Sequence, residues 1–176
     1  LLFHQIKILV LDGHFKVPLF KEELRHFISC VLDEDIGSGD LTTLATIPSI
    51  TNLRAELNTR ETIVVAGIDI AERIIHTVDS AISIEILVQD GVEVTTGNTL
   101  MRLEGNARKI LTAERSALNV LQHLSGIATL TRKYVKEIAH TNCRLLDTRK
   151  TIPMMRKLAK YATRMGGAMN HRMCLD

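Results

Sequence analysis

Residues 106–124 read Asn106-Ala-Arg-Lys-Ile-Leu-Thr-Ala-Glu-Arg-Ser-Ala-Leu-Asn-Val-Leu-Gln-His-Leu124, and the texture of the sequence changes here. Apolar residues recur at spacings of three and four, which predicts an amphipathic helix. Asn106 is a favourable N-cap for it. Gly126 is expected to break the pattern, and a second helix is predicted from there to about His140. The apolar stripe consists of Ile110, Leu111, Leu118, Leu121 and Leu124.

The residues before this helix mix helical and strand patterns. The spacing predicts helices over residues 20–33 and 68–78, and a glycine-punctuated loop over residues 34–43. Asp90-Gly91 is typical of a tight hairpin turn. Short strands are predicted at Leu53–Asn58, Thr62–Ala66, Ile82–Val88, Val92–Thr95 and Thr99–Leu103. Residues 1–105 are therefore expected to form an N-terminal α+β domain.

The residues after the helix have the order of an α/β protein. A short strand is predicted at Arg144–Asp147, a helix at Pro153–Met165, a turn at Gly166-Gly167 and then a further strand. A closed (β/α) barrel needs about 250 residues. Residues 106–176 therefore predict either a smaller open fold or the first part of an incomplete α/β barrel in a truncated chain.

Composition excludes several classes of protein. Of 176 residues, 45% are hydrophobic and 24% charged, which excludes disordered, collagen-like and coiled-coil chains. Tryptophan is absent and aromatics are 3%, so few rings exist for stacking on nucleic-acid bases. The net charge of +2 hides a division, −8 over residues 1–100 and +10 over residues 101–176. That division indicates an anionic ligand in the second part, a face that docks on the first, or a solvated basic surface.

The cysteines and the hydropathy pattern bear on location. Cys30, Cys143 and Cys174 are widely spaced and form no C-x-x-C motif, which makes a disulfide framework or a zinc site improbable. No stretch approaches the ~20 apolar residues of a membrane span. A reducing, cytoplasmic location without membrane association is predicted.

Two polar clusters are candidates for chemistry. Asp147-Thr148-Arg149-Lys150-Thr151 follows the predicted strand, and strand-to-helix loops carry active sites in α/β folds. Arg149 offers a planar fork for a carboxylate or phosphate, and Lys150 a compact charge. Asn170-His171-Arg172 follows the next predicted strand, and His171 is a candidate general acid. Taken singly, each pair of cations is more simply interpreted as solvated surface.

Arg115 is a third candidate. It lies beside the apolar stripe of the helix, and an arginine in that position is usually an interface residue or covers apolar surface with its stem.

Taken together and in order, these segments are more specific than any of them alone. The sequence resembles the quinolinate phosphoribosyltransferase family, the carboxylating nicotinate-nucleotide pyrophosphorylases, over about residues 20–176. The segments that carry the resemblance are Glu34-Asp-Ile-Gly-Ser-Gly-Asp-Leu-Thr-Thr43, Ala66-Gly67, Asp90-Gly91, Gly105-Asn-Ala-Arg108, Glu114-Arg-Ser-Ala-Leu-Asn119, Leu124-Ser-Gly-Ile-Ala-Thr129, Leu146-Asp-Thr-Arg-Lys-Thr151 and Asn170-His-Arg172.

The resemblance implies a reaction that suits a basic pocket. In this family the pyridine nitrogen of quinolinate attacks the anomeric carbon of phosphoribosyl pyrophosphate. Pyrophosphate and CO₂ leave, and nicotinate mononucleotide forms on the de novo route to NAD. The reaction needs Mg²⁺, whose ligands are expected beyond Asp176, with no metal ligand inside this chain. The 176-residue chain alone is therefore expected to be an inactive piece of a transferase.

The resemblance also implies residue roles. Arg149 and Arg172 resemble the residues that bind the quinolinate carboxylates, with Thr148 and His171 beside them. Lys150 resembles the cation near the phosphates, and Lys150 and His171 are the expected catalytic residues. Arg115 resembles an arginine that enters the active site of a partner subunit, which implies a homodimer or a higher oligomer with shared sites.

One departure and two alternatives qualify this interpretation. The family has Pro-Gly-Leu-Arg where this chain has Pro153-Met-Met-Arg156, so Met154 replaces a glycine at the start of a helix. One alternative is a related enzyme acting on nicotinate, which would not require both Arg149 and Arg172. The other is a non-catalytic fragment or paralogue that only dimerises.

Overall fold

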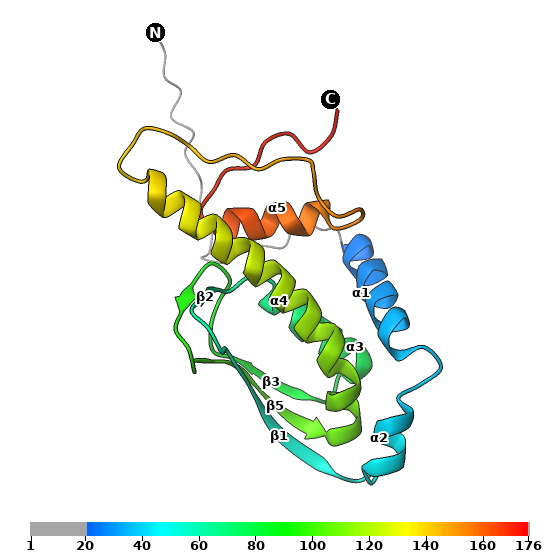
Figure 1. Cartoon of the computed structure of the whole chain (residues 1–176). Coiled ribbons are helices and arrows are strands. Elements are labelled where there is room, and N and C mark those ends of the chain that lie inside the picture. The colour runs from blue at the N-terminus through cyan, green and yellow to red at the C-terminus, as the bar shows by residue number, and fades with distance from the viewer. Residues whose placement is uncertain (1–20, 176) are drawn as a thin grey trace.

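The computed structural model describes residues 21–175, and its helices and strands follow the predicted order (Figure 1). The helices predicted over residues 20–33 and 68–78 are confirmed as α1 and α3. The elements are α1 Lys21–Ile36, α2 Leu41–Thr46, β1 Asn52–Asn58, β2 Ile63–Val64, α3 Ile68–Val78, β3 Ser83–Ile86, β4 Glu93–Val94, β5 Thr99–Asn106, α4 Ala107–Ile138 and α5 Arg156–Met165.

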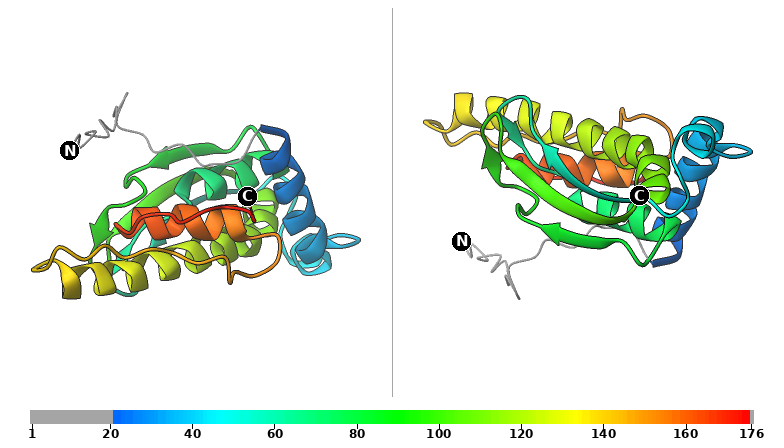
Figure 2. Two further views of the ribbon diagram at one scale, coloured as in Figure 1. Left: turned by 90° about the horizontal axis from the view of Figure 1, so that it is seen from above. Right: turned by 90° about the horizontal axis from the view of Figure 1, so that it is seen from below.

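A three-stranded antiparallel sheet forms the base of the N-terminal part. Its order is β1-β5-β3, with Ala55 opposite Leu103 and Leu103 opposite Ile84. β2 and β4 form a separate antiparallel pair. Helices α3 and α4 cover one face of the sheet (Figure 2), and Ile74 and Leu124 are completely buried. The core residues of this layer are mostly aliphatic.

The hairpin predicted at Asp90-Gly91 is wrong. β3 pairs with β5, and β4 with β2, so the two strands around Asp90 are not partners. The Asp90 carboxylate instead accepts hydrogen bonds from the backbone N–H groups of Gly67 (2.7 Å) and Ile68 (3.0 Å) at the start of α3. The Gly91 N–H donates to the Val65 carbonyl at 2.7 Å. The turn residues therefore cap a helix that is distant in sequence.

The break predicted at Gly126 is also wrong, because α4 runs without interruption from Ala107 to Ile138. A glycine inside a helix costs only about 1 kcal/mol relative to alanine. Leu124 and Ala128, on either side of Gly126, are fully buried, so packing outweighs that cost. The predicted cap is confirmed, since the Asn106 side chain accepts a hydrogen bond from the Lys109 N–H at 3.3 Å.

The loop predicted over residues 34–43 is shorter than expected. α1 continues to Ile36, and α2 begins at Leu41. Asp40 is the N-cap of α2 and accepts a hydrogen bond from the Thr43 N–H at 2.9 Å. Hydrogen bonds from Thr43 hold the pKa of the Asp40 carboxyl below its ordinary value. Asp40, which was predicted to lie in a loop, is thus the N-cap of a helix.

The C-terminal part begins as a parallel α/β unit. Leu146 and Met169 form a parallel bridge, with α5 crossing over between them. The Met169 N–H donates to the Leu145 carbonyl at 3.0 Å, and the Asp147 N–H to the Met169 carbonyl at 3.1 Å. An N-terminal α+β module followed by the first part of an α/β barrel is therefore the observed fold class.

Helix α5 begins at Arg156, three residues later than the predicted start at Pro153. The cause is Met154, which has φ +66°, in the left-handed region that right-handed helices cannot contain. This is the position at which the family resemblance expects a glycine.

The cysteines Cys30, Cys143 and Cys174 are free and exposed. None of the helices between residues 21 and 175 combines the length and the apolar character that crossing a bilayer requires.

Candidate active site

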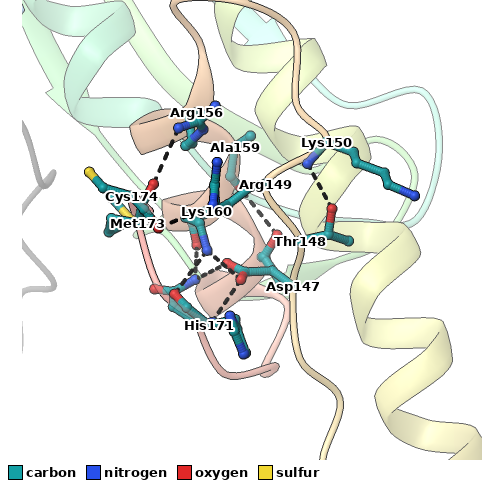
Figure 3. A network of polar contacts seen from close by, with 12 residues as sticks. Asp147, Thr148, Arg149, Lys150, Arg156, Ala159, Lys160, His171, Met173 and Cys174 are labelled. Carbon is teal, nitrogen blue, oxygen red and sulfur yellow. Dashed lines mark hydrogen bonds and ion pairs between the residues drawn. The ribbon is translucent and has the colours of Figure 1, made fainter. Parts of the chain in front are cut away.

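A buried ion pair lies directly after the parallel bridge between Leu146 and Met169, which is all that the structure forms of the strand predicted at Arg144–Asp147 (Figure 3). The Lys160 ammonium of α5 contacts the Asp147 carboxylate at 2.5 Å, and the two side chains are only 2% and 6% exposed. Asp147 belongs to the sequence motif, but Lys160 was missed. Spacing places Lys160 with Arg156 and Arg164 on the polar side of α5, and burial comes from the 145–152 segment, which covers that side.

Asp147 and Lys160 also hold the second strand end. The Asp147 carboxylate accepts hydrogen bonds from the Asn170 amide at 2.6 Å and from the His171 N–H at 2.8 Å. The Lys160 ammonium donates to the His171 carbonyl at 3.0 Å. The loop that carries Arg149 and the loop that carries Arg172 are therefore fastened to one buried pair.

Three arginines gather around the 173–175 segment. Arg156 donates to the Met173 carbonyl (3.2 Å), Arg149 to the Cys174 carbonyl (3.3 Å) and Arg172 to the Leu175 carbonyl (3.2 Å). Because these carbonyls belong to consecutive residues, the guanidinium groups surround one short segment. Within residues 21–175 none of the three forms an ion pair with a carboxylate.

Two of these guanidinium groups have unused donors. The Nε atoms of Arg149 and Arg156 are buried and have no hydrogen-bond partner among the described residues. A buried donor without a partner is costly, and a bound anion is one way to satisfy it. Arg156 is thus a candidate that motif reasoning missed. Sequence reasoning missed Arg156 because its role depends on a long-range contact, and nothing in the sequence indicates that residue 156 meets residue 173.

Lys150 and Thr148 lie on the other side of the loop. The Lys150 N–H donates to the Thr148 hydroxyl at 2.7 Å, and both residues line a cleft of about 350 Å³ against His123 and Thr131 of α4. In Figure 3 the Lys150 ammonium lies away from the network around Asp147. The structure therefore brings Arg149, Arg172 and the His171 backbone together but separates Lys150 from them.

A larger cleft of about 900 Å³ opens beside Arg156, within the 300–1,000 Å³ range of ligand sites. Its walls are α1, the middle of α4 and the 151–158 segment. Arg156, Thr151 and Cys174 line one side, and Glu34 and Asn119 lie on the opposite walls. The cleft has room for a small anionic ring compound next to the Arg156 guanidinium group.

Arg115 is not part of this network. It lies on α4 with its side chain 76% exposed, and its nearest charge is Asp35, 3.7 Å away at the end of α1. Among the described residues no hydrogen bond or ion pair joins it to Arg149 or Arg172.

The part of the chain that the structure describes contains no group of three or more His, Cys, Asp or Glu residues placed to hold a metal ion.

Comparison with known proteins identifies the family of the chain. Residues 40–125 match the family model of the quinolinate phosphoribosyl transferase N-terminal domain, and residues 127–176 match that of the C-terminal domain. Both domains are those of a phosphoribosyl-transferring enzyme. The chain belongs to the quinolinate phosphoribosyltransferase family.

Individual relatives are similar along most of the chain. A probable nicotinate-nucleotide pyrophosphorylase [carboxylating] of Synechocystis is 44% identical over 145 residues, which are 82% of this chain and 49% of that protein. The nicotinate-nucleotide pyrophosphorylase [carboxylating] of Mycobacterium leprae is 41% identical over 154 residues, 86% of this chain and 54% of that protein. The chain thus spans about half the length of these relatives.

A solved structure shows the same fold. The nicotinate-nucleotide pyrophosphorylase from Francisella tularensis superposes with a TM-score of 0.86 at 40% identity, covering 93% of this chain and 59% of that one.

Proposed function

We propose that this chain supplies part of the active site of an enzyme that transfers phosphoribose from phosphoribosyl pyrophosphate to quinolinate with decarboxylation, giving nicotinate mononucleotide, CO₂ and pyrophosphate. The observation that carries the proposal is that three guanidinium groups without a carboxylate partner in residues 21–175 all bind the short segment 173–175. The names of the relatives from Synechocystis and Mycobacterium leprae support it.

The chemistry requires such a cluster of cations. Quinolinate has two carboxylates on adjacent ring carbons, and their mutual repulsion is offset by fixed positive charge. The ring nitrogen forms a bond to the anomeric carbon as the bond to pyrophosphate breaks. Loss of CO₂ then leaves an electron pair on the ring carbon, which preorganised cations stabilise until a proton replaces the carboxylate.

Each site residue has a role in this proposal. Arg149 and Arg172 bind the two carboxylates, with His171 beside them, whereas Thr148 lines the smaller cleft together with Lys150. Lys150 faces the smaller cleft on the other side of the loop, a suitable place for the phosphates. Lys150 and His171 are the candidate catalytic residues. Arg115 is exposed and lies apart from the cluster, as expected of a residue that serves a partner subunit's site.

The remaining partners follow from the reaction. Mg²⁺ is the ion expected to bind together with phosphoribosyl pyrophosphate, and when bound it would supply positive charge to the phosphates. Since residues 21–175 hold no metal-ligand cluster, no step is assigned through the ion. The functional unit is a homodimer or a higher oligomer that acts in the cytoplasm, and the free, exposed cysteines favour a reducing compartment of that kind.

Calorimetric titration of the full-length protein with quinolinate and with nicotinate tests the proposal. Quinolinate should bind, and Arg149→Ala or Arg172→Ala should each weaken binding by about 2–5 kcal/mol, because a carboxylate of the bound ligand loses its charged partner. Arg73→Ala, on the exposed side of α3, is the control and should bind as the wild type does. Equal affinity for nicotinate would favour the related enzyme, and no binding of either acid would favour the non-catalytic dimerising paralogue.

A further inference from the structure

We infer that Lys160 and Asp147 are positioning residues, which set the separation of Arg149 and Arg172 and thereby select a ligand with two adjacent carboxylates. The inference rests on the proposed function for the identity of the ligand. It goes beyond that function in assigning a role to a buried pair that touches neither ring nor phosphate.

The first ground is connectivity. Asp147 lies two residues before Arg149, and its carboxylate binds the N–H of His171, the residue before Arg172. Lys160 binds that carboxylate and also the His171 carbonyl. Both peptide groups that flank the His171 side chain are therefore held by a single ion pair, and a shift of that pair moves the two arginine-bearing loops relative to each other.

The second ground is burial. The side chains of Lys160 and Asp147 are almost completely excluded from water. Desolvating two charges offsets most of their attraction, so an apolar pair of similar size is often as stable. The Asn170 amide also binds Asp147 and the Lys160 carbonyl, which satisfies further polar atoms around the pair. Directional bonds of this kind fix a geometry, which apolar contacts do not do.

The third ground is a contrast within the same helix. Lys157, one turn earlier in α5, pairs with Glu23 of α1 at 2.6 Å, but those two side chains are 36% and 44% exposed. That surface pair lies outside the Asp147 network. α5 therefore contains two lysines in ion pairs. Lys160 is placed to position the site, and a substitution of Lys157 serves as the matched control for a substitution of Lys160.

Amide hydrogen exchange on the ligand-free, full-length protein tests the positioning role directly. In Lys160→Met, the N–H groups of Asp147, Met169 and His171 should exchange about tenfold faster or more, because their acceptors are no longer held in place. The amides of β1 and β5 should keep their rates, and Lys157→Met should leave all of these rates unchanged. Equal protection in Lys160→Met and Lys157→Met would overturn the inference.

Titration with quinolinate and nicotinate tests the consequence for selectivity. Lys160→Met should weaken quinolinate binding by about 10²-fold, as misplacement of binding groups by about 1 Å does, and nicotinate binding by less. The double variant Asp147→Asn, Lys160→Met leaves no unpaired charge, and should regain thermal stability but not quinolinate affinity. If the double variant regained both thermal stability and quinolinate affinity, the ion pair would be only a stabilising contact and the inference would fail. If the wild type bound no quinolinate, the proposed function would fail, and the exchange rates would still decide the positioning role.

Discussion

A single backbone angle explains how the helix that carries Lys160 begins. Met154 has φ +66° and is 88% exposed. The left-handed conformation costs an L-residue about 1–2 kcal/mol and costs glycine almost nothing. The segment 151–155 therefore keeps the sharp turn that a glycine would make more easily, and α5 starts only after it.

Met154→Gly is expected to raise the free energy of unfolding. The gain should be at most about 1 kcal/mol, because glycine removes the strain but makes the unfolded chain more flexible. Urea denaturation measures the difference. Met154→Ala retains the β-carbon and serves as the control, which should gain nothing. Equal stabilisation by alanine and glycine would show that the turn is not strained.

At the scale of helices, two glycines on α4 and α5 differ in the space that surrounds them. A β-carbon on Gly166, at the end of α5, would lie 2.5 Å from Thr131 and 2.6 Å from the Ala128 carbonyl of α4. A β-carbon on Gly126 would meet nothing within 4 Å. α5 thus packs against α4 so closely that only glycine fits at its end, whereas Gly126 is exposed and has no such constraint.

Gly166→Ala should lower the free energy of unfolding by about 1–3 kcal/mol, the usual cost of overpacking. Gly126→Ala should raise it by about 0.5–1 kcal/mol through helix propensity. Thermal denaturation of the two variants beside the wild type checks both signs. If Gly166→Ala instead raised the free energy of unfolding, α4 and α5 would be able to move apart without an energetic cost.

A tyrosine connects α5 to the N-terminal part. The buried Tyr161 hydroxyl donates to the Asp90 carboxylate at 2.6 Å. Burial, and next the negative charge of Asp90, raise the pKa of Tyr161 above its ordinary value. The folded state therefore favours the neutral phenol. Its contribution to stability is complete below the ordinary tyrosine pKa of about 10 and is lost as the pH rises further.

Tyr161→Phe should cost about 1–2 kcal/mol at pH 7, where Asp90 loses a donor. The difference from the wild type should shrink above about pH 10, since only the wild type has to keep this phenol protonated. Urea denaturation from pH 7 to pH 11 measures it, with the exposed Tyr134→Phe as control. A gap that stays constant over this range would contradict the assigned shift.

Sequence reasoning succeeded where local pattern and burial coincide. α3 has the predicted bounds, because Ile70, Ala71, Ile74 and Ile75 are both periodic and buried. It failed where distant contacts decide. The pairing of β3 with β5, the capping of α3 by Asp90 and the burial of Lys160 all depend on segments far apart along the chain.

The same division holds for the site. Arg149 and Arg172 were expected at neighbouring strand ends, and the parallel bridge between Leu146 and Met169 confirms that these ends are adjacent. Arg156 joins them through a contact that no motif indicates. Lys150 follows Arg149 directly, yet it faces the other cleft, because the chain bends at Arg149, where the Thr151 N–H donates to the Arg149 carbonyl.

At the scale of the whole molecule, the proposed role of Arg115 predicts complementation between subunits. Arg115→Ala and Arg149→Ala should each inactivate the full-length enzyme. When the two are unfolded and refolded together, a mixed dimer has one site with both residues intact. Random pairing makes half of the dimers mixed, so about a quarter of wild-type activity should return. No recovery would place both residues in one subunit's site and refute sharing.

Helix α4 has a consequence for how the chain comes apart. It contains 32 residues, about 48 Å at 1.5 Å per residue. Its first half packs on the sheet through Ile110 and Ala117, and its second half holds α5 through Arg132, which donates to the Met165 and Gly166 carbonyls. The two matched family domains meet within this helix, between residues 125 and 127. Because both domains pack on this one helix, neither domain can unfold without exposing packed surface of the other. Calorimetry should therefore record one cooperative transition with equal calorimetric and van't Hoff enthalpies.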